Sequence, residues 1–181
     1  MVLIFRETFL EVPDVFLIRV DPGNEVQIAP SARLTNCTLI VRGSGNRLTI
    51  NSGARLRGVH LELDGVDCVL EVGENTLVGE GGYLSARERG TALRIGRDCA
   101  LSRNVKVMTS DGHAILQDSE RINPARSITL EDHVWLTDGV VVLKGVTINS
   151  VLTRSIGANT AAASNSARII RENISHRDAL E

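Results

Sequence analysis

A spacing of six residues between aliphatic side chains constrains this sequence more than any other feature. It is clearest near the C-terminal end, at Leu130, Leu136, Val142 and Ile148, with valines four residues after the first three, at Val134, Val140 and Val146. A period of six matches neither the α-helix, with about 3.6 residues per turn, nor a simple alternating strand, and it is typical of a parallel β-helix built from hexapeptides. We therefore expect three short sides to close each coil of about eighteen residues.

The same spacing recurs upstream, at Ile28, Leu34, Ile40, Val72, Val78, Leu84, Ile95, Leu101 and Val107. We therefore expect an all-β chain in which residues 25–165 form the β-helix. Residues 1–24 do not follow the spacing and are predicted to cap one end, with Val15–Val20 as a capping strand. Residues 166–181 are predicted to form a short C-terminal helix, over 166–174, and a tail that caps the other end. An insertion interrupts the spacing at Ala86–Ala92.

The composition suits a narrow prism, because aromatic residues make up only 3% of the chain. The side chains predicted to point inward include Val72, Val78, Ile95, Cys99, Leu101, Val134, Leu136, Val140, Val142 and Val146. Cys37, Cys68 and Cys99 are odd in number and widely spaced, which argues against a disulfide scaffold or a zinc site and favours buried structural thiols. A net charge of −2 suggests neither nucleic acid nor an anionic membrane as a partner.

The N-terminus lacks a signal-peptide pattern, and no apolar run reaches the roughly 18 residues of a membrane span. We therefore expect a cytoplasmic protein. The six-residue spacing stops at Thr109 and returns near Ile128, and residues 110–126 between them are too polar for a coil side. A loop of this length in a compact repeat is usually functional or disordered, and a functional role is predicted for residues 110–126.

A recognisable set of motifs lies in and after this loop, at Ser110–His113, Glu120–Asn123, Asp132–Leu136 and Val142–Ile148. The set shows a resemblance to the hexapeptide-repeat acyltransferases. It is greatest to the bacterial polysaccharide O-acetyltransferases, including those that acetylate the polysialic acid capsule. The chain departs from that family after Ile148, where it passes directly into Ser150–Thr153. We therefore expect the region around Ile148–Leu152 to be either disordered or structurally broken.

The resemblance implies a left-handed parallel β-helix and a homotrimer with active sites between neighbouring subunits. It also implies acetyl-CoA as the donor, a hydroxyl of a sugar or polysaccharide as the acceptor, and no metal. Acetyl transfer to an alcohol requires a base for the hydroxyl proton, a donor for the oxyanion and a slot for the thioester.

His113 is the predicted general base, because histidine titrates near neutral pH and its Ser-Asp-Gly-His context matches the family. A carboxylate that orients the imidazole is expected from Asp111, Asp118 or Glu120, and a backbone carbonyl would serve equally. By resemblance Trp135 lines the active site, where its indole N–H acts only as a donor. His133 is expected to face outward in a structural or interface role.

Lys144, Arg168 and Arg171 are candidate partners for the phosphates of acetyl-CoA. Residues 79–82, Gly-Glu-Gly-Gly, lack the Lys-Ser/Thr of a phosphate loop and are predicted to form coil corners. An N-acetyltransferase acting on an amino sugar would use the same base. A γ-type carbonic anhydrase would need three zinc-binding histidines at a spacing that this chain lacks. A non-catalytic β-helix scaffold would have no need to interrupt its coils around a histidine.

Overall fold

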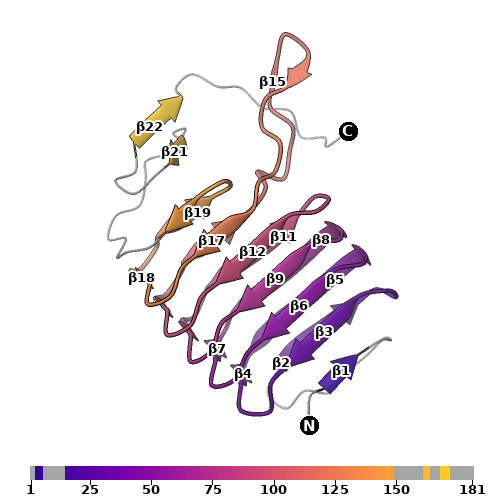
Figure 1. Cartoon of the computed structure of the whole chain (residues 1–181), viewed down its shortest axis with the longest axis vertical. Coiled ribbons are helices and arrows are strands. Elements are labelled where there is room, and N and C mark those ends of the chain that lie inside the picture. Colours follow the sequence, from indigo (N-terminus) through magenta and orange to yellow (C-terminus); the bar gives the residue numbers. More distant parts are fainter. Residues whose placement is uncertain (1–2, 6–14, 149–160, 164–167, 172–181) are drawn as a thin grey trace.

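The computed structural model describes residues 3–5, 15–148, 161–163 and 168–171, with side chains from residue 18 to residue 148. Most of its strands stack into three sheets, and the chain visits these three sheets in turn, so that each circuit makes one coil (Figure 1). The predicted parallel β-helix of hexapeptide repeats is confirmed.

The first sheet contains β1 (Leu3–Phe5), β3 (Glu25–Ile28), β6 (Arg47–Ile50), β9 (Val69–Val72), β12 (Ala92–Ile95), β17 (Ile128–Leu130) and β20 (Thr147–Ile148). The second contains β4 (Arg33–Thr35), β7 (Arg55–Arg57), β10 (Leu77–Val78), β13 (Ala100–Leu101) and β18 (Trp135–Leu136). The third contains β2 (Val15–Val20), β5 (Cys37–Ser44), β8 (His60–Val66), β11 (Tyr83–Arg87), β14 (Lys106–Met108) and β19 (Val141–Leu143).

Coil length differs from the expected eighteen residues in all but the last described coil. Thr129 pairs with Thr147, 18 positions later, whereas Arg47 pairs with Val69 after 22 and Leu93 with Ile128 after 35. The extra residues lie at one place, the corner where the chain passes from the third sheet to the first. The insertion at Ala86–Ala92 lies at this corner in one coil. The 110–126 loop lies at the same corner of the next coil and is the longest insertion there. The enlarged corners therefore stack on one edge of the β-helix and position the loop.

The register predicted for Ile40 is wrong. Leu39 and Val41 are fully buried, while Ile40 between them is only partly buried and faces outward. The corner before β5 is one residue shorter than the six-residue period requires, since the buried Leu34 is followed after five positions by the buried Leu39. Alternation along an extended strand then moves Ile40 to the outer face.

The inward positions predicted from the spacing form the core. Nine of the ten are buried, and Val146 is partly buried against them. Cys37, Cys68 and Cys99 are free, buried thiols, as expected. Burial raises the pKa of all three thiols, even though each Sγ donates to a carbonyl of a neighbouring coil, for example Cys99 to Glu131 at 3.1 Å. Raised pKa values keep them protonated and unreactive.

The strands near the two ends of the chain pair differently. At the N-terminal end β1 pairs antiparallel with β3, and β2 pairs parallel with β5. Near the C-terminus the predicted helix is wrong over Arg168–Arg171, which is strand β22 and pairs antiparallel with β21 (Ala161–Ala163). The adjacent β-branched Ile169 and Ile170 favour a strand over a helix.

The remainder of the predicted 166–174 helix lies outside the described residues, as does the break predicted after Ile148. The division into a cap, a β-helix and a tail stays a prediction. Every regular element in the described part of the chain is a strand, so that part contains no helix able to span a membrane.

Candidate active site

The 110–126 loop projects from the largest enlarged corner as a short hairpin (Figure 1). Its strands are β15 (Leu116–Gln117) and β16 (Glu120–Arg121), which pair antiparallel. Asp118 and Ser119 join them with φ values of 51° and 68°, and two positive φ values in a two-residue connection are typical of a type I′ turn. The hairpin therefore has a defined conformation rather than that of an open loop.

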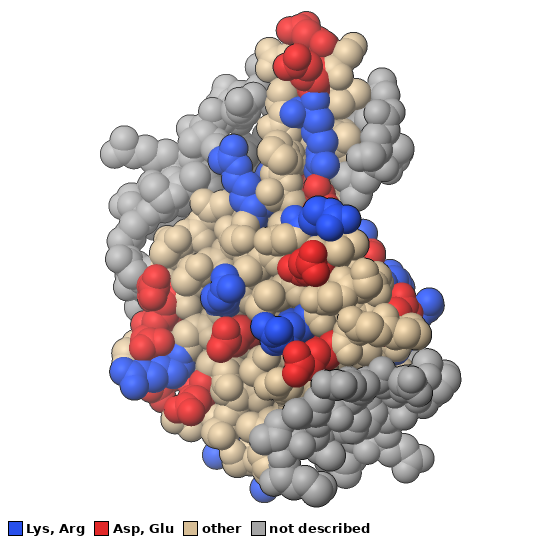
Figure 2. Space-filling model, turned by 45° about the vertical axis from the view of Figure 1, so that its right-hand side comes forward, with Lys and Arg blue, Asp and Glu red and all other residues tan. Residues whose placement is uncertain are grey.

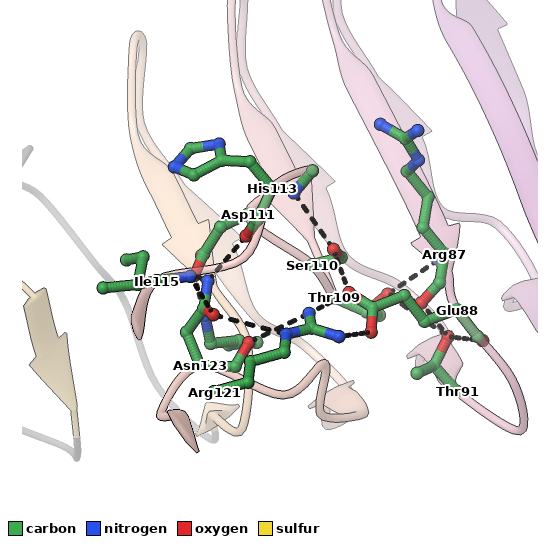
Figure 3. A network of polar contacts seen from close by, with 12 residues as sticks. Arg87, Glu88, Thr91, Thr109, Ser110, Asp111, His113, Ile115, Arg121 and Asn123 are labelled. Carbon is green, nitrogen blue, oxygen red and sulfur yellow. Dashed lines mark hydrogen bonds and ion pairs between the residues drawn. The ribbon is translucent and has the colours of Figure 1, made fainter. Parts of the chain in front are cut away.

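Asn123 holds the segment around His113 in place. Its side chain is buried, and its Nδ2 donates to Asp111 Oδ2 at 2.7 Å and to the His113 carbonyl at 2.8 Å. Its Oδ1 accepts from the backbone N–H of Ile115 at 2.6 Å. One amide thus links the Asp111 carboxylate, the His113 carbonyl and the Ile115 N–H (Figure 3).

A second anchor ties the hairpin to the preceding coil. Arg121 donates from Nη1 and Nη2 to the two carboxylate oxygens of Glu88 at 2.8 and 2.7 Å. The Ser110 hydroxyl also donates to Glu88, at 2.6 Å, and accepts from the N–H of Gly112 at 3.0 Å. Burial by itself would raise the pKa of Glu88, but the hydrogen bonds from Arg121 and Ser110 outweigh it and hold that pKa below its usual value.

Lys144 forms an ion pair with Asp111. Both side chains are largely buried, 17% and 19% exposed, and the pair links the turn after β19 to the loop. The Asp111 carboxylate therefore accepts from both Asn123 and Lys144. The role predicted for Lys144, binding coenzyme phosphate, stays a prediction and would compete with this pair. Arg168 and Arg171 lie in β22, and their side chains are outside the described residues.

The His113 side chain is partly buried, and its imidazole points away from the network that holds its backbone (Figure 3). The Arg87 side chain, from β11, points to the same side. A methyl group added at Gly112 would lie 3.4 Å from Arg87 Nη1, so the guanidinium lies next to the loop. The imidazole therefore lies on the same side of the loop as the Arg87 guanidinium, which is paired with Asp64 at 3.3 Å.

The three candidate carboxylates are placed differently. Asp111 lies near the backbone of His113, because the Asn123 side-chain amide donates hydrogen bonds both to the Asp111 carboxylate and to the His113 carbonyl. Asp118 and Glu120 are exposed at the far end of the hairpin, where Glu120 pairs with Gln117. The identity of the group that orients the imidazole stays a prediction. Among residues 15–148, no group of three or more His, Cys, Asp or Glu side chains is arranged to hold a metal ion.

Trp135 does not meet His113 within one chain. It lies on β18 in the second sheet, where it is 49% exposed and its Nε1 donates to Ser102 Oγ at 3.3 Å. The His113 loop leaves the corner between the third and first sheets, and in a three-sided coil the second sheet is the side opposite that corner. A site containing both side chains therefore needs a second chain.

His133 faces outward, as expected. It is exposed at a coil corner with a φ of 60°, and its N–H donates to the Arg97 carbonyl at 2.9 Å. Asp98 and Asn75 adopt the same left-handed conformation at the two preceding corners, with φ values of 53° and 54°. Residues 79–82 also form a corner, as predicted, with Gly81 at a φ of +75°.

The residues that hold the loop were not assigned from the sequence. Arg121 and Asn123 lie in the Glu120–Asn123 segment, which carried the family likeness, but that likeness gave them no role. Glu88 had no sequence signal, because its connection to Arg121 depends on how neighbouring coils stack.

No protein-family model matches this chain. It is 30% identical over 125 residues to the polysialic acid O-acetyltransferase of Neisseria meningitidis, covering 68% of this chain and 57% of that protein. It is 31% identical over 135 residues to the enzyme of the same name from Escherichia coli O1:K1, covering 69% of this chain and 43% of that protein. The chain thus spans about half the length of these relatives.

Among solved structures, the polySia-specific acetyltransferase NeuO matches with a TM-score of 0.58 and 25% identity, over 91% of this chain and 83% of that one. Sequence and fold therefore agree with the likeness first seen in the motifs. The chain is therefore similar in both sequence and fold to the polysialic acid O-acetyltransferases, and it is a homologue of these proteins.

Proposed function

We propose that this protein transfers an acetyl group from acetyl-CoA to a hydroxyl of a bacterial surface sugar or polysaccharide. The observation that carries the proposal is the fixed presentation of His113. Asn123 bonds to its carbonyl at 2.8 Å, and the imidazole projects from the enlarged corner (Figure 3). The relatives named polysialic acid O-acetyltransferases support an acidic glycan as the acceptor.

In this reaction the imidazole of His113 removes the proton as the sugar oxygen attacks the thioester carbonyl, giving a tetrahedral oxyanion. The carbon–sulfur bond then breaks, and the imidazolium returns the proton to the departing thiolate. A free hydroxyl is a poor nucleophile at neutral pH, so the base acts on the step that limits the chemistry. The indole N–H of Trp135 is the candidate donor toward the reacting groups.

The active form is proposed to be a homotrimer with each site between two protomers. In support, His113 and Trp135 lie on opposite sides of the coil, so one chain cannot supply both to one substrate. Trp135 and Leu77, 49% and 46% exposed, are the large apolar side chains most exposed among the described residues, and both lie on the second sheet. A neighbouring protomer that extends its hairpin over this sheet would join the two halves of the site.

Acetyl-CoA is the proposed donor, and its use implies a cytoplasmic site of reaction. Lys144, Arg168 and Arg171 remain the candidates for its phosphates. For Lys144, binding phosphate would require the ammonium to leave Asp111.

The test is acetyl transfer by the purified full chain against a panel of acceptors, with the products mapped by mass spectrometry. The panel contains polysialic acid, a neutral polysaccharide and an amino sugar. An acetyl ester on the acidic glycan, cleaved by mild alkali, supports the proposal. An alkali-stable amide formed only on the amino sugar would assign N-acetyl transfer instead. A folded protein that modifies none of the three would favour a scaffold.

A further inference from the structure

We propose that three arginines on the second sheet, Arg33, Arg55 and Arg57, form an extended subsite for a linear polyanionic glycan. We call them the arginine ladder. The inference deepens the proposed function, on which it rests, because it assigns the ladder to the acceptor polymer at a distance from the reacting hydroxyl.

The ladder has the geometry of a row. Arg33 on β4 pairs in register with Arg55 on β7, and Thr35 pairs with Arg57 two positions further along the same strands. The intervening Leu34 and Leu56 are buried, so alternation along the strands directs all three guanidinium groups outward. All three arginines are exposed.

The ladder is not neutralised by the rest of the described chain. Within residues 15–148, no carboxylate lies within ion-pair distance of its members, although nine other basic side chains are paired. The Cγ of Glu80 would lie 3.0 Å from a methyl group added at Gly58, next to Arg57. Even so, Glu80 forms no ion pair with Arg57 among the described residues. Like charges on directly opposed strand positions destabilise a sheet, and an anion bound across them would relieve that repulsion.

The ladder lies in line with the candidate active site. From Arg55 the register continues through Leu77 and Ala100 to Trp135, on β7, β10, β13 and β18. Strands in a sheet are about 4.8 Å apart, which puts the Arg55 backbone about 14 Å from that of Trp135, and Arg33 one strand further. Figure 1 shows β4 and β7 side by side toward the N-terminal end of the stack, with β18 at the other end.

This arrangement fits a polymer better than a single small anion. Guanidinium groups bind carboxylates in a planar, two-bond geometry, and a linear acidic glycan presents one carboxylate on each sugar residue. Its reacting residue would lie near Trp135, and the following residues would run along the second sheet to reach the ladder. The net charge of the chain is −2, and basic and acidic side chains are interspersed on the face drawn in Figure 2. The row is therefore not part of a generally basic surface.

Binding is measured with the full chain and fluorescently labelled polysialic acid, by anisotropy over a range of salt concentrations. The Arg55→Glu/Arg57→Glu double variant is expected to weaken binding by about tenfold or more, since attraction becomes repulsion. The wild-type affinity should fall as salt increases. Arg94→Glu is the matched control, because Arg94 is also exposed but lies on the first sheet; it should change affinity by less than about twofold.

Kinetics provide the second arm. The double variant should raise KM for the polymer while leaving kcat, KM for acetyl-CoA and turnover of a one- or two-sugar acceptor unchanged. An Arg55→Gln/Arg57→Gln variant should give a smaller change in the same direction, and thermal unfolding verifies that both variants are folded.

The outcomes separate the ladder from the proposed reaction. Ladder-dependent binding of polysialic acid without acetyl transfer would support the ladder and refute the proposed function. Acetyl transfer with an unchanged polymer KM in both variants would refute the ladder alone. A rise in KM for acetyl-CoA instead would assign the arginines to the donor phosphates. Equal loss of binding to a single-stranded oligonucleotide of similar charge would show a general polyanion surface, and would overturn a glycan subsite.

Discussion

Arg121 and Glu88 form a two-bond ion pair, at 2.8 and 2.7 Å, between the hairpin and the enlarged corner of the preceding coil. The two residues are 33 positions apart in the chain. The pair fixes the base of the hairpin that carries His113, so it connects the stacking of the coils to the position of the proposed catalytic base.

Arg121→Met should destabilise the protein by about 1–3 kcal/mol, because it leaves the partly buried Glu88 carboxylate without its partner. The Arg121 and Glu88 side chains are 26% and 20% exposed. Urea unfolding at neutral pH measures the change. Arg103→Met is the control, since its pair with Asp138 is short but exposed; it should leave the midpoint almost unchanged. Equal effects of the two substitutions would contradict a special role for the buried pair.

The Arg121–Glu88 pair should also make the hairpin sensitive to acid. Because the folded-state pKa of Glu88 lies below the usual 4.5, its ionisation stabilises the fold at neutral pH. That contribution is lost as pH falls through the lowered folded value. Amide hydrogen exchange of the hairpin, corrected for intrinsic rates, should therefore accelerate below about pH 4.5. Glu88→Gln should remove this pH dependence, and an unchanged profile in that variant would assign the transition to another carboxyl.

His113→Ala should lower kcat by about 10²–10⁴-fold, the usual contribution of a positioned acid–base group, with little change in KM for acetyl-CoA. His133→Asn is the control, because Asn tolerates the left-handed backbone at that corner, and it should be nearly silent. Steady-state kinetics with a glycan acceptor measure both. Wild-type turnover in His113→Ala together with loss of activity in His133→Asn would reverse the assignment.

Asn123→Ala should lower kcat by about tenfold or more through loss of the bonds to His113 and Ile115. Binding of acetyl-CoA should change little, because Asn123 bonds only to the loop in the described structure. Measuring kcat and the coenzyme Kd separately distinguishes misplacement of the base from general unfolding, which would weaken both.

Mixed trimers test whether the active site is shared. His113→Ala and Trp135→Ala should each impair transfer, and Trp135→Phe separates loss of the indole donor from loss of packing. Chains carrying the two alanine substitutions, refolded together in equal amounts, should recover about a quarter of the wild-type sites, because random assembly pairs an intact His113 with an intact neighbouring Trp135 in that fraction. No recovery, or a stable and active monomer by light scattering, would refute the shared site.

The six-residue spacing by itself determined the fold and most of the core. Each hexapeptide directs one aliphatic side chain into a narrow prism, so positions such as Val72, Leu101 and Leu136 could be assigned inward without any tertiary information. The same reasoning located Cys99 in the core and the 110–126 loop outside it. Motif likeness identified His113 and Trp135 as candidates, because each lies in a short segment that resembles the family and can be recognised without the fold.

The tertiary structure decided what depends on stacking and corner length. Ile40 faces outward because the preceding corner is one residue short, and no local signal reveals a corner length. Arg168–Arg171 is a strand because it pairs with a second backbone segment, whereas a short apolar run alone is compatible with either structure. The Arg121–Glu88 and Asp111–Lys144 pairs and the in-register row from Arg33 to Trp135 exist only once coils are superimposed, because stacking brings together residues that are about twenty or more positions apart.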